Sequence, residues 1–104
     1  MPMRSGRLEK RTRLAIPVQI SSLQDPTTGE RTITENVCSL GLRVLLGRAR
    51  ELNERLLIKS IGGDPQILAR VVYCERLSDG RFGVGLQFQH KGANWVKESL
   101  ARED

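Results

Sequence analysis

The sequence predicts an all-β domain, a small six-stranded antiparallel barrel followed by a C-terminal α-helix. Three observations favour this fold class: short segments in which apolar and polar residues alternate, turn-forming residues between those segments, and one helical stretch after the last of them. The 104 residues suffice for one domain with one core. Apolar residues make up 38% of the chain and charged residues 28%, which is typical of a globular protein rather than a disordered one.

The first two strands are predicted at residues 14–21 and 31–37, joined by an Asp-Pro-Thr-Thr-Gly turn at residues 25–29. Every second residue of the first strand is apolar, so one of its faces should be buried. The residues on that face are Leu14, Ile16, Val18 and Ile20. Pro17 lies on the other face, and because it lacks a backbone N–H we expect it at a sheet edge or a bulge. The two strands should pair as a hairpin.

The remaining strands follow the same alternation. Residues 42–46 and 55–59 are predicted as strands, and residues 48–54 between them fit either a helical turn or a loop. The longest strand is expected at residues 67–76, and a tight Ser-Asp-Gly turn leads from it into a last strand at residues 82–88. The predicted inward faces of these two strands are Ile67, Ala69, Val71 and Tyr73, and Phe82, Val84, Leu86 and Phe88.

The predicted helix covers residues 93–103. Asn94 is a candidate N-cap, and Trp95 would anchor the helix against one end of the barrel. On the last strand, the face opposite the apolar residues carries Gly83 and Gly85, which permit the close backbone approach that a closed barrel requires.

Basic residues are concentrated at the start of the chain. Residues 1–13 carry five basic residues against one acidic residue, a net charge of +4, whereas the whole chain has a net charge of +5. We therefore divide the chain into a basic N-terminal arm at residues 1–13 and a barrel with its terminal helix at residues 14–104. Charge gathered in one arm favours anion binding, although a solvated tail would have the same composition.

Several classes of function lack the residues they need. No apolar run approaches the roughly 18 residues of a membrane helix, and no apolar stretch of a secretory signal follows the basic start. We therefore expect a cytoplasmic protein without membrane insertion. Cys38 and Cys74 lie far apart and His90 is the single histidine, so a metal site would be short of ligands. No Ser/His/Asp set, phosphate-binding glycine loop or carboxylate pair is recognisable, and we expect neither an enzyme nor a cofactor.

Two short motifs lie next to the first predicted hairpin. Arg7 and Arg11 form an R-x-x-x-R spacing just before the first strand, and residues 36–41 read Asn-Val-Cys-Ser-Leu-Gly at the end of the second strand. Antiparallel pairing brings the start of one strand beside the end of the other. Both motifs are therefore expected at one rim of the barrel.

The order and spacing of these motifs resemble the PilZ domain, the bacterial family of cyclic di-GMP receptors. The family pattern is R-x-x-x-R, then a strand hairpin, then [D/N]-x-S-x-x-G. Arg7 and Arg11 match the first motif, and Asn36 and Gly41 match the second. One position departs from the pattern, because Cys38 stands where the family has serine.

The later segments 69–73 and 80–88 also look like the closing strands of the family, so the resemblance covers roughly residues 7–90. It implies a set of residues that bind cyclic di-GMP and no catalytic residue, metal or cofactor. The implied ligand-binding residues are Arg7, Arg11, Arg13, Asn36, Cys38 and Gly41.

The chemistry of these side chains suits the implied ligand. The planar fork of arginine can bind phosphate oxygens and also the O6 and N7 atoms of guanine. Asn36 offers an amide to a base edge, and Gly41 can turn the backbone or admit a purine. The thiol of Cys38 is a weaker hydrogen-bonding group than a hydroxyl, which implies an affinity roughly tenfold lower.

The resemblance also implies a mechanism for a bacterial cytoplasmic receptor. The ligand would neutralise the arm, draw it against the rim, and change the surface met by a protein partner of a motility, secretion or polysaccharide machine. One alternative is a PilZ-fold protein-interaction adaptor with weak or no nucleotide binding, which Cys38 favours. Another is a nonspecific nucleic-acid binder that uses the basic arm. Aromatic residues are 4% of the chain, too few for a base-stacking surface, so no specific nucleic-acid partner is expected.

Overall fold

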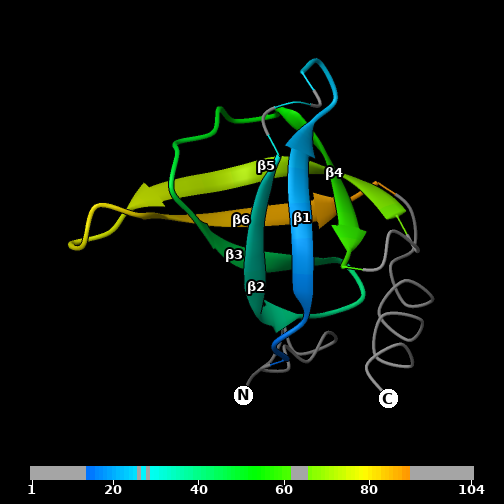
Figure 1. Cartoon of the computed structure of the whole chain (residues 1–104), viewed down its shortest axis with the longest axis horizontal. Coiled ribbons are helices and arrows are strands. Elements are labelled where there is room, and N and C mark those ends of the chain that lie inside the picture. Colours follow the sequence, from blue (N-terminus) through cyan, green and yellow to red (C-terminus); the bar gives the residue numbers. More distant parts are fainter. Residues whose placement is uncertain (1–13, 26, 28, 62–65, 90–104) are drawn as a thin grey trace, which may run out of the picture.

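The computed structural model describes residues 14–25, 27, 29–61 and 66–89. Its strands are β1 (Pro17–Ser22), β2 (Glu30–Val37), β3 (Gly41–Leu46), β4 (Arg55–Ser60), β5 (Gln66–Arg76) and β6 (Phe82–Phe88). They close into a barrel in the order β1-β2-β3-β6-β5-β4, and every neighbouring pair is antiparallel (Figure 1). The predicted six-stranded barrel is confirmed. The predicted helix at 93–103 and the arm at 1–13 lie outside the described residues.

Period-two alternation builds most of the core, because alternate side chains of a strand point into the barrel and most of those that do are apolar. The predicted inward faces of β1 and β6 are confirmed: Ile16, Val18 and Ile20 are at most 1% exposed, and Val84 and Leu86 at most 2%. Leu14 and Phe82 are partly buried and pack against this cluster. The described part of the chain contains no helix with the length and apolarity needed to cross a membrane.

Two β-bulges break the alternation. One lies in β2 between Thr34 and Asn36, and the other lies in β5 between Val71 and Tyr73. The bulge in β5 reverses the prediction for Tyr73, whose ring lies on the outer face above Gly85 instead of in the core. Cys74 takes the inward position and packs against the core. One extra residue shifts every later side chain to the other face, which simple alternation does not reveal.

The connections are set by local backbone chemistry. Between β5 and β6, the Gly80 N–H donates to the Leu77 carbonyl at 3.0 Å, and Gly80 has a φ of 90°, which only glycine adopts readily. The segment 48–54, left open between a helical turn and a loop, is a loop in which Asn53 has a φ of 69°. Pro17 lies at neither an edge nor a bulge. It is the first residue of β1, where its missing N–H is tolerated.

Candidate functional site

The segment 36–41 comprises the end of β2, the connection at residues 38–40 and the first residue of β3. This segment, the 36–41 turn, is tight and held by several hydrogen bonds. The Cys38 N–H donates to the Gly41 carbonyl at 2.9 Å, and the Leu40 N–H lies 3.4 Å from the Cys38 sulfur, which accepts it. The Leu40 carbonyl accepts from the Phe88 N–H at 2.8 Å, which fixes the turn to the end of β6. The sulfur of Cys38 therefore takes the place of an oxygen acceptor within the turn.

Gly41 has a structural reason to be glycine. It is the first residue of β3 and is buried, with Gln87 of β6 as its cross-strand partner. A Cβ at this position would lie 2.0 Å from the Leu86 carbonyl oxygen, a backbone atom that cannot rotate away. The close approach that the sequence suggested is therefore made by β6 of the barrel itself.

The start of β1 is bound to the end of β2 through Thr34. The Thr34 hydroxyl accepts from the Ile16 N–H at 2.9 Å and donates to the Leu14 carbonyl, and the Thr34 N–H donates to the Ile16 carbonyl at 3.0 Å. Thr34 is 3% exposed, so these bonds are shielded from water. The chain thus enters the barrel two residues away from Asn36. This places residues 14–16 at the same rim as the 36–41 turn, whereas the R-x-x-x-R motif predicted at that rim lies outside the described residues.

The predicted binding residues fall into two groups. Arg7, Arg11 and Arg13 lie outside the described residues. Asn36, Cys38 and Gly41 lie together in the 36–41 turn and at its two ends, with Asn36 and Cys38 half-buried. The described half of the predicted site is therefore compact.

Arg43 is a neighbour of this site that sequence reasoning missed. It is the cross-strand partner of Asn36, because the bulge at residue 35 shifts the register of β2 against β3. Its Nε donates to Glu35 at 2.7 Å, and its Nη1 lies 2.8 Å from Glu75 and donates to the Tyr73 hydroxyl at 3.0 Å. The hydrogen bonds to Tyr73 and Glu35 raise the pKa of Arg43 further above its already high value. Two carboxylates thus balance its charge.

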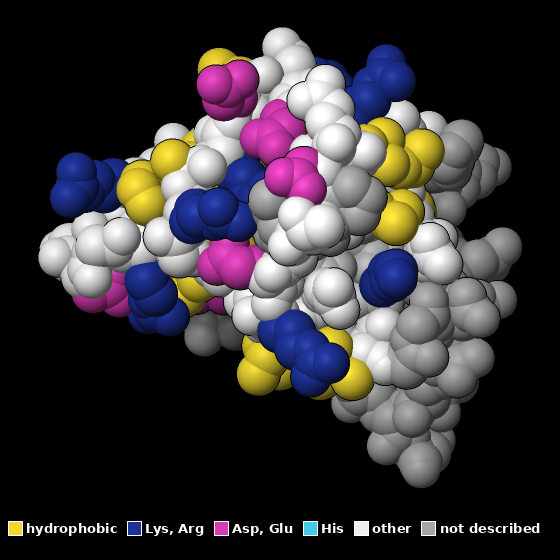
Figure 2. All heavy atoms as spheres, turned by 45° about the horizontal axis from the view of Figure 1, so that its top comes forward, with side chains coloured by type: hydrophobic (Ala, Val, Ile, Leu, Met, Phe, Trp, Pro, Cys, Tyr) yellow, Lys and Arg dark blue, Asp and Glu magenta, His cyan; other side chains and the backbone are white. Residues whose placement is uncertain are grey.

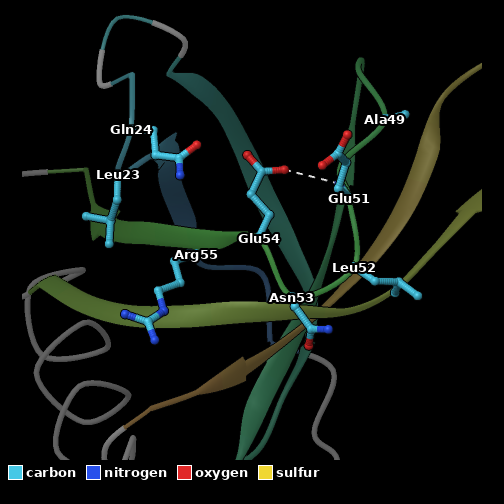
Figure 3. A pocket seen from close by; sticks show the side chains of 8 residues that line it. All are labelled: Leu23, Gln24, Ala49, Glu51, Leu52, Asn53, Glu54 and Arg55. Carbon is cyan, nitrogen blue, oxygen red and sulfur yellow. Dashed lines mark hydrogen bonds between the residues drawn. The ribbon is translucent and has the colours of Figure 1, made fainter.

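A separate pocket of about 800 Å³ lies at the opposite end of the barrel, where β3 has ended and β4 begins (Figure 3). Its lining residues are Leu23, Gln24, Ala49, Glu51, Leu52, Asn53, Glu54 and Arg55. Figure 2, which turns the top of Figure 1 forward, shows both acidic and basic side chains on this face. The charged residues of this lining are two acidic and one basic, Glu51, Glu54 and Arg55. The pocket as a whole thus offers an anionic dinucleotide no net positive charge, so the candidate site remains the rim that carries the 36–41 turn.

No protein-family model and no curated protein matches the sequence. Among solved structures, the barrel is similar to the PilZ domain of CeSA from a cellulose-synthesizing bacterium, with a TM-score of 0.63 and 18% identity, over 91% of this chain and 99% of that domain. This chain has a PilZ-type fold. The PilZ-type barrel is also similar to MotI/DgrA, an inhibitor of motility from Bacillus subtilis, with a TM-score of 0.67 and 19% identity. That match covers 96% of this chain and 50% of MotI/DgrA, so the chain spans about half its length.

Proposed function

We propose that the protein is a cyclic di-GMP receptor that couples this second messenger to a protein partner through its basic arm. One observation carries the proposal: Thr34, two residues from Asn36, binds Leu14 and Ile16, which directly follow the arm in the chain. An arm that begins there can bring Arg7 and Arg11 over the 36–41 turn. The PilZ-type fold supports the proposal. So does the order of the motifs, R-x-x-x-R followed by the second motif with Cys38 in place of its serine.

The proposed division of labour follows from side-chain chemistry. Arg7 and Arg11 bind phosphate oxygens or guanine edges through their forks, and Arg13 adds charge or stacks on a base. Asn36 presents its amide to a base edge. Gly41 acts by holding β3 against β6, so its part in binding is to shape the turn rather than to contact a purine.

The proposed mechanism is the ordering of the arm. Without ligand, the repulsion between arginines disfavours a compact arm, and a ligand with two phosphates removes that repulsion. The ordered arm then presents a new surface to a partner. The names of the similar structures, a motility inhibitor and a domain from a cellulose-synthesizing bacterium, fit a motility or polysaccharide machine as that partner. We assign the protein no catalytic role and place it in the bacterial cytoplasm.

A second candidate function is a PilZ-fold adaptor with weak or no nucleotide binding. Cys38 favours it, because the thiol sits where the family pattern has a serine hydroxyl and is already used as an acceptor within the turn. Such an adaptor would use the same barrel to contact a protein without a nucleotide signal.

Calorimetric titration separates these functions. The full chain is titrated with cyclic di-GMP, GTP and a short DNA duplex, each at low and at high salt. The receptor is expected to bind cyclic di-GMP saturably and more tightly than GTP at both salt concentrations. Binding of all three that ignores base identity and collapses at high salt would indicate nonspecific anion binding instead. If the chain binds none of the three ligands, the adaptor function is favoured.

A further inference from the structure

A row of cross-strand neighbours leads from the 36–41 turn across the sheet. The cross-strand register pairs Gly41 of β3 with Gln87 of β6, Gln87 with Arg70 of β5, and Arg70 with Arg55 of β4. Neighbouring strands lie about 4.8 Å apart, so the backbone of Arg70 lies about 10 Å from Gly41. The row therefore leads from the candidate rim toward the opposite end of the barrel, where Arg55 also lines the pocket of Figure 3.

Neutral groups hold the Arg70 side chain in place. Its Nη1 donates to Asn53 Oδ1 at 2.7 Å and its Nη2 donates to Gln87 Oε1 at 2.8 Å. Asn53 is itself fixed, because it has a φ of 69° and its N–H donates to the Val71 carbonyl at 2.8 Å. The bond to Gln87 directs the guanidinium toward β6, one strand closer to Gly41. Arg70 is thus oriented while its charge is not neutralised.

The charge balance of Arg70 differs from that of other arginines in the barrel. Arg43, Arg50 and Arg81 each lie within 4.0 Å of at least one carboxylate. Across the ranges that the structure describes, neither Arg70 nor Arg55 has such a neighbour. Two like charges at directly paired positions of neighbouring strands repel each other, so this pair costs stability unless an anion binds between them.

Two described acidic residues that line the same pocket as Arg55, Glu51 and Glu54, form no ion pair with Arg55 or Arg70. In Figure 3, Glu51 and Glu54 lie on one side of the loop, and Asn53 and Arg55 lie on the other. Glu54 is engaged elsewhere, since it accepts from the Glu51 N–H at 3.1 Å and lies 3.6 Å from the buried guanidinium of Arg50. As far as the described residues go, the outer face around Arg70 is therefore positive.

We propose that Arg70, with Arg55 beside it, binds a phosphate of the cyclic dinucleotide whose other groups meet the 36–41 turn. This inference rests on the proposed function. Arg43 lies nearer to Asn36, but Glu35 and Glu75 neutralise its charge. Arg70 is therefore the oriented cation of the row whose charge is not neutralised. The arm then supplies cations from the β1 side of the turn, and Arg70 supplies one from the β6 side.

The test compares Arg70→Gln with Arg31→Gln. Arg31 is an exposed cation on the outer face of β2, opposite Gln19 and outside the row, so its variant removes the same charge elsewhere. Calorimetry measures the affinity of the full chain and both variants for cyclic di-GMP, and thermal unfolding checks that each is folded. We expect Arg70→Gln to weaken binding about tenfold or more and Arg31→Gln to leave it within about twofold. A third variant, Arg70→Lys, keeps the charge without the fork and should fall between Arg70→Gln and the unchanged protein.

Each result decides the inference. If Arg70→Gln binds as well as the unchanged protein, or no worse than Arg31→Gln, Arg70 does not contact the ligand. If the unchanged protein binds no cyclic di-GMP, the proposed function fails. A titration with inorganic pyrophosphate then tests whether Arg70 and Arg55 form an oxyanion site. The site is retained as an oxyanion site if pyrophosphate saturably shifts the Arg70 and Gln87 side-chain N–H signals and the Gln87 shift disappears in Arg70→Gln. The absence of these shifts would overturn it.

Discussion

Replacing Gly41 with alanine is expected to destabilise the barrel by about 3 kcal/mol, at the upper end of the usual cost of overpacking a core. The added Cβ would lie 2.0 Å from the Leu86 carbonyl oxygen and 3.1 Å from the Gln87 Cα, and both of these are backbone atoms. To relieve this overlap, β3 and β6 must separate. The 2.8 Å bond from the Phe88 N–H to the Leu40 carbonyl then weakens, although one such bond contributes only about 0.5–1.5 kcal/mol.

Thermal unfolding by circular dichroism measures this effect, and about 3 kcal/mol corresponds to a fall in Tm of roughly 10–20 °C for a domain of this size. Gly80→Ala is the matched control, since no atom lies within 4 Å of a Cβ there and only its φ of 90° opposes the change. Its cost should be about 1 kcal/mol. If Gly41→Ala unfolds within about 2 °C of the unchanged protein, the close approach of β3 and β6 is not what makes this residue glycine. If the Tm of Gly41→Ala falls as expected, a loss of ligand binding in this variant reflects its lower stability and not a lost ligand contact.

Three further changes test the rim and the hairpin. Thr34→Val should cost about 1–3 kcal/mol in urea unfolding, because it leaves the buried Ile16 N–H without its acceptor; an unchanged midpoint would contradict this. Cys38→Ser should strengthen cyclic di-GMP binding by up to about tenfold in calorimetry, and weaker binding would show that the thiol is not a deficit. Hydrogen bonds from Arg81 lower the pKa of Asp79 below its usual 3.8, so the charged pair stabilises the hairpin above that pH and this stability is lost as the pH falls below it. Asp79→Asn should therefore be less stable at neutral pH and equal at low pH, and a gap that persists in acid would refute the assignment.

Much of the fold follows from local pattern. Alternation in β1 and β6 identified Ile16, Val18, Val84 and Leu86 as inward-facing, and the structure buries all of them. The hairpin turn before β6 followed from its Ser-Asp-Gly sequence, because Gly80 needs a positive φ. These features depend on residues close together in the chain, which is why the sequence alone could reveal them.

The bulges could not be predicted in the same way. Nothing in the alternation of β5 distinguishes Tyr73 from the inward-facing residues before it, yet one extra residue places its ring outside, where its hydroxyl accepts from Arg43. The bulge in β2 likewise makes Asn36 the cross-strand partner of Arg43. Such register depends on contacts between strands far apart in sequence.

The candidate site was predictable in part. The hairpin predicted that the two motifs meet at one rim. The bonds of Thr34 place residues 14–16 beside the end of β2, and the meeting of Arg7 and Arg11 with the 36–41 turn stays a prediction. The role of Gly41 in admitting β6 and the alignment of Arg70 with it depend on the order of strands around the barrel. That order is a property of the whole fold, so no short motif could reveal it.

The central claim is that two guanidinium groups of the arm hold cyclic di-GMP against the 36–41 turn. The most direct measurement is the affinity of the double variant Arg7→Ala/Arg11→Ala for cyclic di-GMP, by calorimetry on a protein whose thermal unfolding is unchanged. Each arginine makes charge-assisted bonds worth about tenfold or more, so we expect affinity to fall about a hundredfold. An affinity equal to that of the unchanged protein would contradict the account.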